Sequence, residues 1–212
     1  MNKFKLAVKH FKKICTHKKW VFKYCRLFGI TWRGIKHDMS KFSPVEFLES
    51  IQYYTGTHSP IDECKKVNGY SKAWLHHKGR NDHHYEHWQD NFDKGGEPIR
   101  MPYEQSVEML CDYLGAARAY LGDKFTYQGE FEWFCNKLNN NVAMHIANKV
   151  FIYNALYMLA CVEKNLYKET TLMVWNTVPK RLQNTLDYVY ANSLEYSEKD
   201  FLELREQCER GE

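Results

Sequence analysis

Apolar side chains recur every three or four positions along the first part of the chain, up to Gly29. The series runs through Phe4, Val8, Phe11, Ile14, Cys15, Val21, Tyr24, Cys25 and Phe28. Such spacing gathers apolar residues on one face of a long α-helix, whole or broken once. The sequence contains no stretch of useful length in which apolar and polar residues alternate as they do in a half-buried strand. The chain is therefore predicted to be all-α.

Further helices are predicted from periodicity, caps and breakers. They cover Thr31 to Asp38, 43–54, 61–78, a segment from Asn81 or Asp82 that carries His83, His84 and His87, 102–121, 128–138, 142–166, a segment opening at Pro179, and a last helix capped by Ser197. The loop from Asp93 to Pro102 is long enough to lie over a site. We expect residues 1–125 to form a metal-binding helical core, with 126–212 packed on it as additional C-terminal helices of the same domain.

Composition narrows the class of protein further. The 212 residues are 44% hydrophobic and 16% aromatic, which is enough for one substantial core. The seven cysteines form no C-x-x-C pair and are odd in number, so a reducing cytoplasm is expected. The longest charge-free apolar run, Val150 to Val162, has 13 residues and contains Asn154, which is too short and too polar for a bilayer span. We see no secretion signal at the N-terminus.

Positive charge is concentrated at the N-terminal end. Residues 1–36 contain eleven Lys or Arg and no acid, whereas the whole chain has a net charge of only +4. Such a block favours an anionic partner, which could be nucleic acid, a nucleotide or a membrane surface. A solvated helix face would produce the same pattern.

The pair His37-Asp38 can present an imidazole and a carboxylate to one divalent cation. Lys41 follows three residues later, about one helical turn away, where its ammonium could meet an anion held by that cation. His17 lies 20 residues before His37, on or beside the buried face of the first helix. Asp112 lies in a helical segment with small neighbours, where a metal ligand and a buried salt bridge are both reasonable readings.

Five of the ten histidines lie between positions 76 and 87. Adjacent residues on a helix point about 100° apart. One of His76 and His77, and one of His83 and His84, could therefore turn inward while the others form hydrogen bonds outside. The spacing does not choose between them.

In this order, His17, His37-Asp38-x-x-Lys41, His76-His77, His83-His84 and Asp112 resemble the HD-domain superfamily of metal-dependent phosphohydrolases, over about residues 14–122. The resemblance implies an HD-domain-like helical bundle. It also implies that the first metal is held by His17, His37, Asp38 and Asp112, and a second by the later histidines. The chain lacks the Gly-Tyr-Pro segment of the branch that cleaves cyclic dinucleotides, because Gly79-Arg80-Asn81 follows His76-His77. The segments 37–47 and 74–92 also look similar to an uncharacterised family of Gram-positive bacteria and their phages.

The activity implied is hydrolysis of a nucleotide or other phosphate ester, with one or two divalent ions chosen from Mn, Fe, Co, Ni, Zn and Mg. Such an ion lowers the pKa of water, and the hydroxide attacks phosphorus. Asp38 would orient this nucleophile, while Lys41 and Arg80 would offset charge on the phosphoryl oxygens.

Two other functions fit the sequence. The first is an inactive HD-like protein, such as a phage or bacterial accessory factor, that binds a nucleotide or nucleic acid through residues 1–36. The second is a helical protein that docks on a membrane surface or a partner through its first helix, although this leaves the histidines unexplained.

Overall fold

The computed structural model describes residues 3–57, 59–140, 142–166 and 174–210, and the prediction of an all-α protein is confirmed. The α-helices are α1 (Lys3–Leu27), α2 (Thr31–Lys36), α3 (Pro44–Tyr53), α4 (Pro60–Asn68), α5 (Lys72–Arg80), α6 (Tyr103–Leu121), α7 (Tyr127–Leu138), α8 (Ile146–Leu166), α9 (Val174–Ser193) and α10 (Glu198–Arg210). Short 3₁₀ segments are η1 (Met39–Phe42), η2 (Tyr85–His87), η3 (Phe92–Lys94) and η4 (Gly122–Lys124). The two strands, β1 (Gln89–Asp90) and β2 (Glu97–Pro98), form an antiparallel hairpin.

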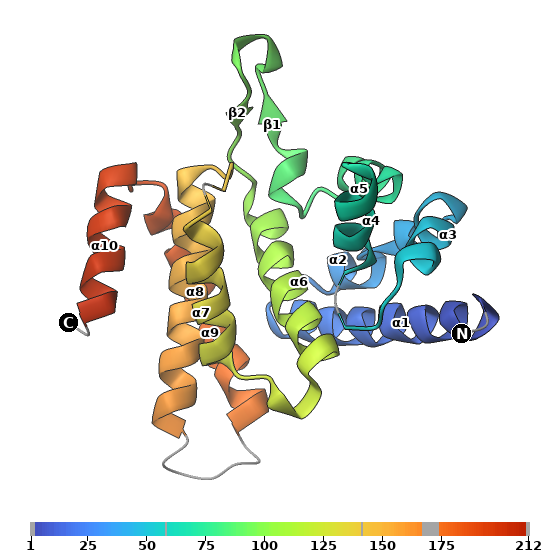
Figure 1. Ribbon diagram of the computed structural model, residues 1–212. Helices are drawn as coiled ribbons and strands as arrows, with labels where there is room; N and C mark the ends of the chain where they lie inside the picture. The colour runs from blue at the N-terminus through green and yellow to red at the C-terminus, as the bar shows by residue number, and fades with distance from the viewer. Residues whose placement is uncertain (1–2, 58, 141, 167–173, 211–212) are drawn as a thin grey trace.

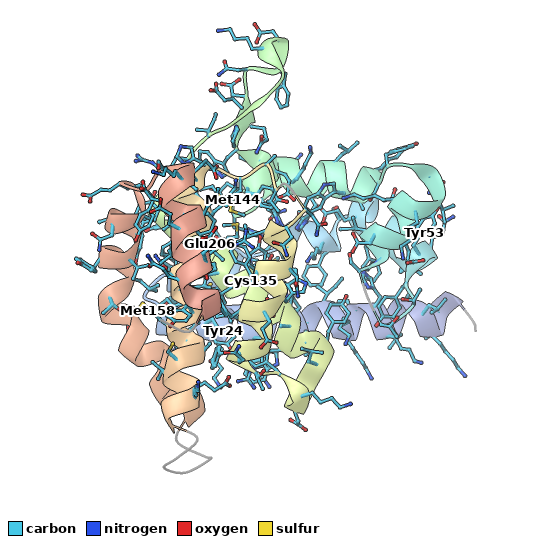
Figure 2. The ribbon with its side chains drawn as sticks, turned by 60° about the vertical axis from the view of Figure 1, so that its left-hand side comes forward. Tyr24, Tyr53, Cys135, Met144, Met158 and Glu206 are labelled. Atoms are coloured by element: carbon cyan, nitrogen blue, oxygen red, sulfur yellow. The ribbon has the colours of Figure 1, made fainter. Side chains whose placement is uncertain are left out.

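Helix α6 stands at the centre of the fold (Figure 1). The long helix α1 crosses it, and α3 to α5 form a small lobe over the N-terminal half of α1. Helix α2 packs on the C-terminal half of α1, with Gly34 against Phe22 and Cys25. Helices α7 to α10 pack on the other side of α6, and the β1–β2 hairpin projects away from the helices. Figure 2 shows the same division, with Tyr53 in the small lobe and Met158 and Glu206 on the side of the C-terminal helices.

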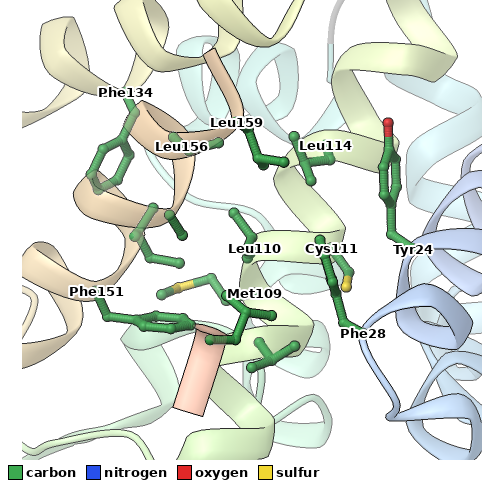
Figure 3. Close-up of a cluster of buried hydrophobic side chains, with 14 of the residues drawn as sticks. Tyr24, Phe28, Met109, Leu110, Cys111, Leu114, Phe134, Phe151, Leu156 and Leu159 are labelled. Atoms are coloured by element: carbon green, nitrogen blue, oxygen red, sulfur yellow. The ribbon is translucent and has the colours of Figure 1, made fainter. Parts of the chain in front are cut away.

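The hydrophobic core lies where α1, α6, α7 and α8 meet (Figure 3). Leu110 and Leu114 of α6, Phe134 of α7 and Phe151 of α8 are fully buried. Burial of each such side chain contributes about 1.5–3 kcal/mol. Phe201 of α10 belongs to the same cluster. Residues from both ends of the chain therefore share one core, which holds α6 in place.

A glycine sets the distance between α1 and α6. A Cβ added at Gly115 would lie 3.0 Å from the backbone nitrogen of Val21 and still closer to its side chain. Only glycine therefore permits this approach. Since Val21 lies one turn after His17, and Gly115 about one turn after Asp112, the contact brings those two side chains towards each other.

Several predicted boundaries were wrong. The helix predicted over 61–78 is two helices, because Gly69 has a left-handed backbone (φ 78°) that ends α4. Helix α8 begins at Ile146 rather than 142, where the Nδ1 of His145 accepts a hydrogen bond from Ala147 N at 3.2 Å. Helix α9 begins at Val174, so Pro179 does not open it.

The predicted covering loop is also different in the structure. Much of the segment 93–102 belongs to the β1–β2 hairpin, with left-handed glycines at 95 and 96 in its turn. The hairpin points away from the helices (Figure 1), and none of its residues lines the cavity described below. Among the described residues, we find no helix that is both long enough and apolar enough to span a bilayer.

Candidate metal centre

Four of the predicted ligands meet in the space between α1, α6 and the turn after α2. The Nε2 of His17 lies 3.0 Å from the Oδ1 of Asp112, 3.2 Å from the Oδ2 of Asp38 and 3.3 Å from the Nε2 of His37. The Nε2 of His37 lies 3.3 Å from Asp38 Oδ2 and 3.4 Å from Asp112 Oδ1. Two imidazole nitrogens and two carboxylate oxygens therefore surround one small volume, with a donor set that suits a divalent transition metal.

The backbone at positions 37 and 38 makes this convergence possible. Helix α2 ends at Lys36, so it does not carry His37 and Asp38 as predicted. His37 is extended (φ −47°, ψ 129°), and Asp38 has a left-handed backbone (φ 56°, ψ 23°). Left-handed φ is uncommon for residues other than glycine. The sharp change in chain direction lets the two adjacent side chains face one centre. On a helix, adjacent side chains would point about 100° apart.

A second group of ligands uses the other oxygen of Asp38. Its Oδ1 lies 3.3 Å from the Nε2 of His77 and 3.5 Å from the Nε2 of His83. The Nε2 of His84 lies 2.9 Å from that of His77. All four side chains can direct one ligand atom to a common point. Asp38 therefore stands between two clusters, with one oxygen in each.

Two atoms of the second group test whether a cation fits there. Asp38 Oδ1 and His83 Nε2 are buried, and neither has a hydrogen-bond partner among the described residues. A buried polar atom without a partner costs about 1–3 kcal/mol, and such atoms are rare in folded proteins. A carboxylate oxygen and an imidazole nitrogen that face each other unsatisfied are the donors that a divalent cation would satisfy, so the residues fit a metal.

The histidines at 83 and 84 do not lie on a helix, contrary to the prediction. Residues 82–84 form a turn, and His84 has an extended backbone (φ −92°, ψ 129°). Both side chains can therefore face inward, whereas a helix would have turned one of them away. Of the earlier pair, only His77 joins the cluster. The Nδ1 of His76 donates to Glu46 Oε1 at 2.7 Å. His87 is exposed and donates from its Nδ1 to the carbonyl of Lys78.

Two buried glutamates orient the imidazoles. Glu108 Oε1 accepts hydrogen bonds from the Nδ1 of His37 at 2.8 Å and the Nδ1 of His83 at 3.2 Å. Glu46 Oε2 accepts from the Nδ1 of His77 at 2.8 Å. These bonds place a proton on each Nδ1 and turn each Nε2 towards the centre, where it can bind a metal ion that displaces any proton on that nitrogen, as in many metal sites. They also account for the close grouping of Glu108 with His37 and His83.

Neither glutamate was predicted to belong to the site. The segment Ser43-Pro44-Val45-Glu46 has the pattern of a helix capping box, and Ser43 Oγ accepts a hydrogen bond from Glu46 N. The glutamate side chain, however, turns to the histidines. Glu108 gave a usable signal, since it lies four residues before Asp112 and thus on the same helix face. Arg33 donates to Glu108 Oε2 at 2.5 Å. No pattern in the sequence indicated that Arg33 belongs to the site.

The pKa values of the two carboxylates at the centre are lowered by the groups around them. Burial would raise the pKa of Asp38, but the positive charges of His37 and Lys41 outweigh it and hold that pKa well below its ordinary value. Burial acts on Asp112 in the same way, and hydrogen bonds from His17 and His37 lower its pKa well below the usual range. Both carboxylates are therefore ionised at neutral pH and can bind a divalent ion.

The predicted phosphate contacts occupy different positions. Lys41 lies at the centre, with its Nζ 2.5 Å from Asp38 Oδ2. Burial works to lower the pKa of Lys41, but the carboxylates of Asp38 and Asp112 raise it, so this side chain is a cation. Arg80 is exposed at the end of α5 and does not line the adjacent cavity. Lys18, which had no predicted role, donates from its Nζ to the carbonyl of His37 and so supports the turn.

A cavity of about 220 Å³ opens beside the centre. Its lining includes His17, His77, His84 and Asp112 from the two ligand clusters, together with Lys41. A molecule in this cavity would contact the metal ligands directly.

These features define an all-α protein with a buried His/Asp cluster able to hold divalent metal. Residues 6–158 match the family of unknown function DUF5662, and the chain belongs to that family. The matched region contains every candidate ligand and continues through α7 into α8. No curated protein and no solved structure matches the chain.

Proposed function

We propose that this protein is a metal-dependent phosphohydrolase of the HD type that acts on a phosphate ester. The observation that carries the proposal is the position of Asp38, whose two oxygens face two separate imidazole clusters. Lys41 adds a cation on the same carboxylate, 2.5 Å away. Two cation sites that share a carboxylate, with a lysine beside them, suit the charge of a phosphoryl group.

The metal, when bound, would supply a water of lowered pKa as nucleophile and would polarise a phosphoryl oxygen. The rest of the chemistry belongs to the chain. Asp38 accepts a hydrogen bond from the attacking water and orients it towards phosphorus. Lys41 donates to a non-bridging phosphoryl oxygen, where negative charge grows in the transition state. Glu108 and Glu46 keep the Nδ1 protons of the imidazoles in place and so fix the geometry of the site.

The test combines metal analysis with turnover. Protein purified without a histidine tag should contain one or two divalent ions per chain by elemental analysis. It should hydrolyse at least some members of a panel of phosphate monoesters and diesters in the presence of Mn²⁺ or Co²⁺. A chelator should abolish this activity, and added metal should restore it. Failure to bind metal at micromolar concentration would refute the proposal at its first step.

A second function is favoured by the basic face of α1. Lys5, Lys9, Lys12, Lys19 and Lys23 are all exposed. An inactive relative of the phosphohydrolases would use this face to bind nucleic acid or a nucleotide and would keep metal for structure alone. Stoichiometric metal without turnover of any ester, combined with salt-sensitive nucleic acid binding that Lys9→Glu and Lys12→Glu abolish, would favour this alternative.

A further inference from the structure

The cavity beside the metal centre is lined along both α1 and α6 beyond the metal ligands. From α1, His17 lies at the metal end and His10 two turns away, with Ile14 between them. Seven residues at 1.5 Å per residue span about 10 Å, and the two histidines lie on the same helix face. From α6, Asp112 lies at the metal end and Tyr120 two turns away. The cavity therefore leads from the metal ligands to a far end formed by His10 and Tyr120.

His10 is an unexplained polar group at that far end. It is only 6% exposed, and its Nδ1 is buried without a hydrogen-bond partner among the described residues. Its ring packs on Phe47 and Tyr54, with centroids 5.6 and 4.9 Å apart. A phenylalanine would pack there equally well, and the orphaned nitrogen costs about 1–3 kcal/mol. Packing thus explains the ring but not the nitrogen.

The protonation state of His10 suits a neutral ligand group. Burial, with a smaller contribution from the positive charge of Lys41, lowers the pKa of His10 to about 4. Among the charged groups that line the cavity, Lys13 and Lys41 are cations, whereas Glu46 and Asp112 already have histidine partners. A neutral imidazole can exchange one hydrogen bond with an uncharged polar group.

The walls between the two ends suit a flat ring. Small side chains at Ala73 and Ala116 leave the space, and Trp74 and Tyr120 supply aromatic surface. Trp74 is held edge-on against His84, with ring centroids 5.1 Å apart, so its position is tied to the metal ligands. Lys13 lies over the ring of Tyr120 and donates to the carbonyl of Ala119 at 2.8 Å. The far end is therefore held in place.

The volume limits what can enter. A cavity of about 150 Å³ lined by apolar side chains accepts benzene. The cavity here, at about 220 Å³, therefore accepts one substituted ring or a small fused pair, but not a second ring unit joined by another phosphate.

We propose that this cavity binds the organic group of a small ring-bearing phosphate monoester, and that His10 forms a hydrogen bond with an uncharged polar substituent of that ring. The inference rests on the proposed phosphohydrolase function, which supplies the reason for a phosphate at the metal end. His10 acts in it as a specificity-determining residue about 10 Å from the chemistry.

Phosphonates test the proposal because they bind without being hydrolysed. The probes are methylphosphonate, phenylphosphonate and its three hydroxyphenyl isomers, titrated calorimetrically into the Mn²⁺-loaded protein. We expect phenylphosphonate to bind at least tenfold more tightly than methylphosphonate. At least one hydroxyphenyl isomer should bind about tenfold more tightly again, as one good hydrogen bond allows. A hydroxyl can donate or accept, so the outcome does not depend on the tautomer of His10.

Two variants test the hydrogen bond from His10 and the binding of the ring separately. His10→Phe keeps the ring packing and should abolish only the advantage of the hydroxyl. The matched control His87→Phe makes the same change at an exposed histidine outside the cavity and should alter nothing. Ala116→Leu fills the cavity and should abolish the advantage of the ring, with metal content unchanged. This variant also tests the claim if His10→Phe does not fold.

The outcomes test the cavity proposal and the phosphohydrolase function separately. Equal binding of methyl- and phenylphosphonate, or a hydroxyl advantage that survives in His10→Phe, overturns the cavity proposal even if phosphate esters are hydrolysed. Ring and hydroxyl preferences without turnover of the corresponding aryl phosphates uphold the cavity as a binding site and overturn the phosphohydrolase function.

Discussion

The two faces of α6 show how differently one helix can be used. One face carries Leu110 and Leu114, which are fully buried in the apolar core shared with α7 and α8. The other carries Glu108 and Asp112, which face buried histidines and an arginine. The first face is satisfied by packing alone. The second borders the metal centre, where Asp38 Oδ1, from the turn after α2, has no hydrogen-bond partner among the described residues. The apolar face therefore contributes to stability, whereas the polar face belongs to a cluster that could hold a metal ion.

If this division is right, Asp38→Asn should have the largest effect. Asparagine keeps the shape of the side chain but removes the charge that holds the cation and orients the nucleophile. We expect metal occupancy to fall and turnover to drop by more than about 10³-fold. Elemental analysis and initial rates measure the two effects, with the exposed Asp62→Asn as control. Turnover at the wild-type rate would show that catalysis does not take place at this centre.

Phe134→Ala tests the apolar face. Phe134 is fully buried in the core, so its truncation should lower the free energy of unfolding by about 3–5 kcal/mol. Metal content per folded chain should stay at the wild-type value. Chemical denaturation followed by circular dichroism gives the stability, and elemental analysis gives the metal. Loss of metal from protein that is still folded would show that the apolar face also affects metal binding.

Lys41→Ala should separate chemistry from metal binding within the polar face. The ammonium is not a metal ligand, so metal content should remain near that of the wild type. Loss of its contact with phosphoryl oxygens should reduce kcat/KM by about 10²–10³-fold. Arg80→Ala is the informative comparison, because Arg80 is exposed outside the cavity. A large loss in Arg80→Ala with none in Lys41→Ala would reverse the assignment.

Glu130 of α7 couples the apolar core to the metal centre, because its pKa depends on burial and on the charge of Asp112. Burial, and then the negative charge of Asp112, raise the pKa of Glu130 to about 8. The folded state therefore keeps a proton that the unfolded state releases near pH 4.5. Stability should fall as pH rises from about 4.5 to 8, by about 5 kcal/mol, and Glu130→Gln should flatten this slope. Urea denaturation at pH 5 and pH 8 measures it. An unchanged slope in the variant would show that Glu130 ionises normally.

Glu108→Gln should have the smallest effect of the five. Glutamine keeps a hydrogen-bond acceptor but loses the charge that fixes the Nδ1 protons of His37 and His83. Changes of this kind reduce metal affinity or activity by about 10–100-fold. Competition with a metal indicator gives the affinity, and Glu104→Gln on an exposed position of the same helix is the control. If affinity is unchanged, Glu108 serves Arg33 rather than the histidines.

Local sequence determined most of the helices, because the three- and four-residue periodicity of apolar side chains is a property of each helix by itself. It also supplied the ligand types in their order along the chain, including His17, the His37-Asp38 pair and Asp112. Where prediction of the fold failed, a single backbone conformation was usually responsible. Gly69 ends α4, and the turn at 82–84 replaces a helix. Such conformations depend on the surroundings as well as on the residue.

Only the tertiary structure decided which histidines face the centre and what holds them there. His83 and His84 both turn inward because their segment is a turn, whereas His76 donates to Glu46 and lies outside the ligand groups. His17 reaches Asp112 because Gly115 lets α1 and α6 approach closely, and no helical pattern in either segment reports that contact. The physical reason is that helix patterns are local in sequence, whereas the site is formed by contacts between distant segments. Periodicity records which face of a helix is apolar, while a binding site depends on where faces from distant parts of the chain meet.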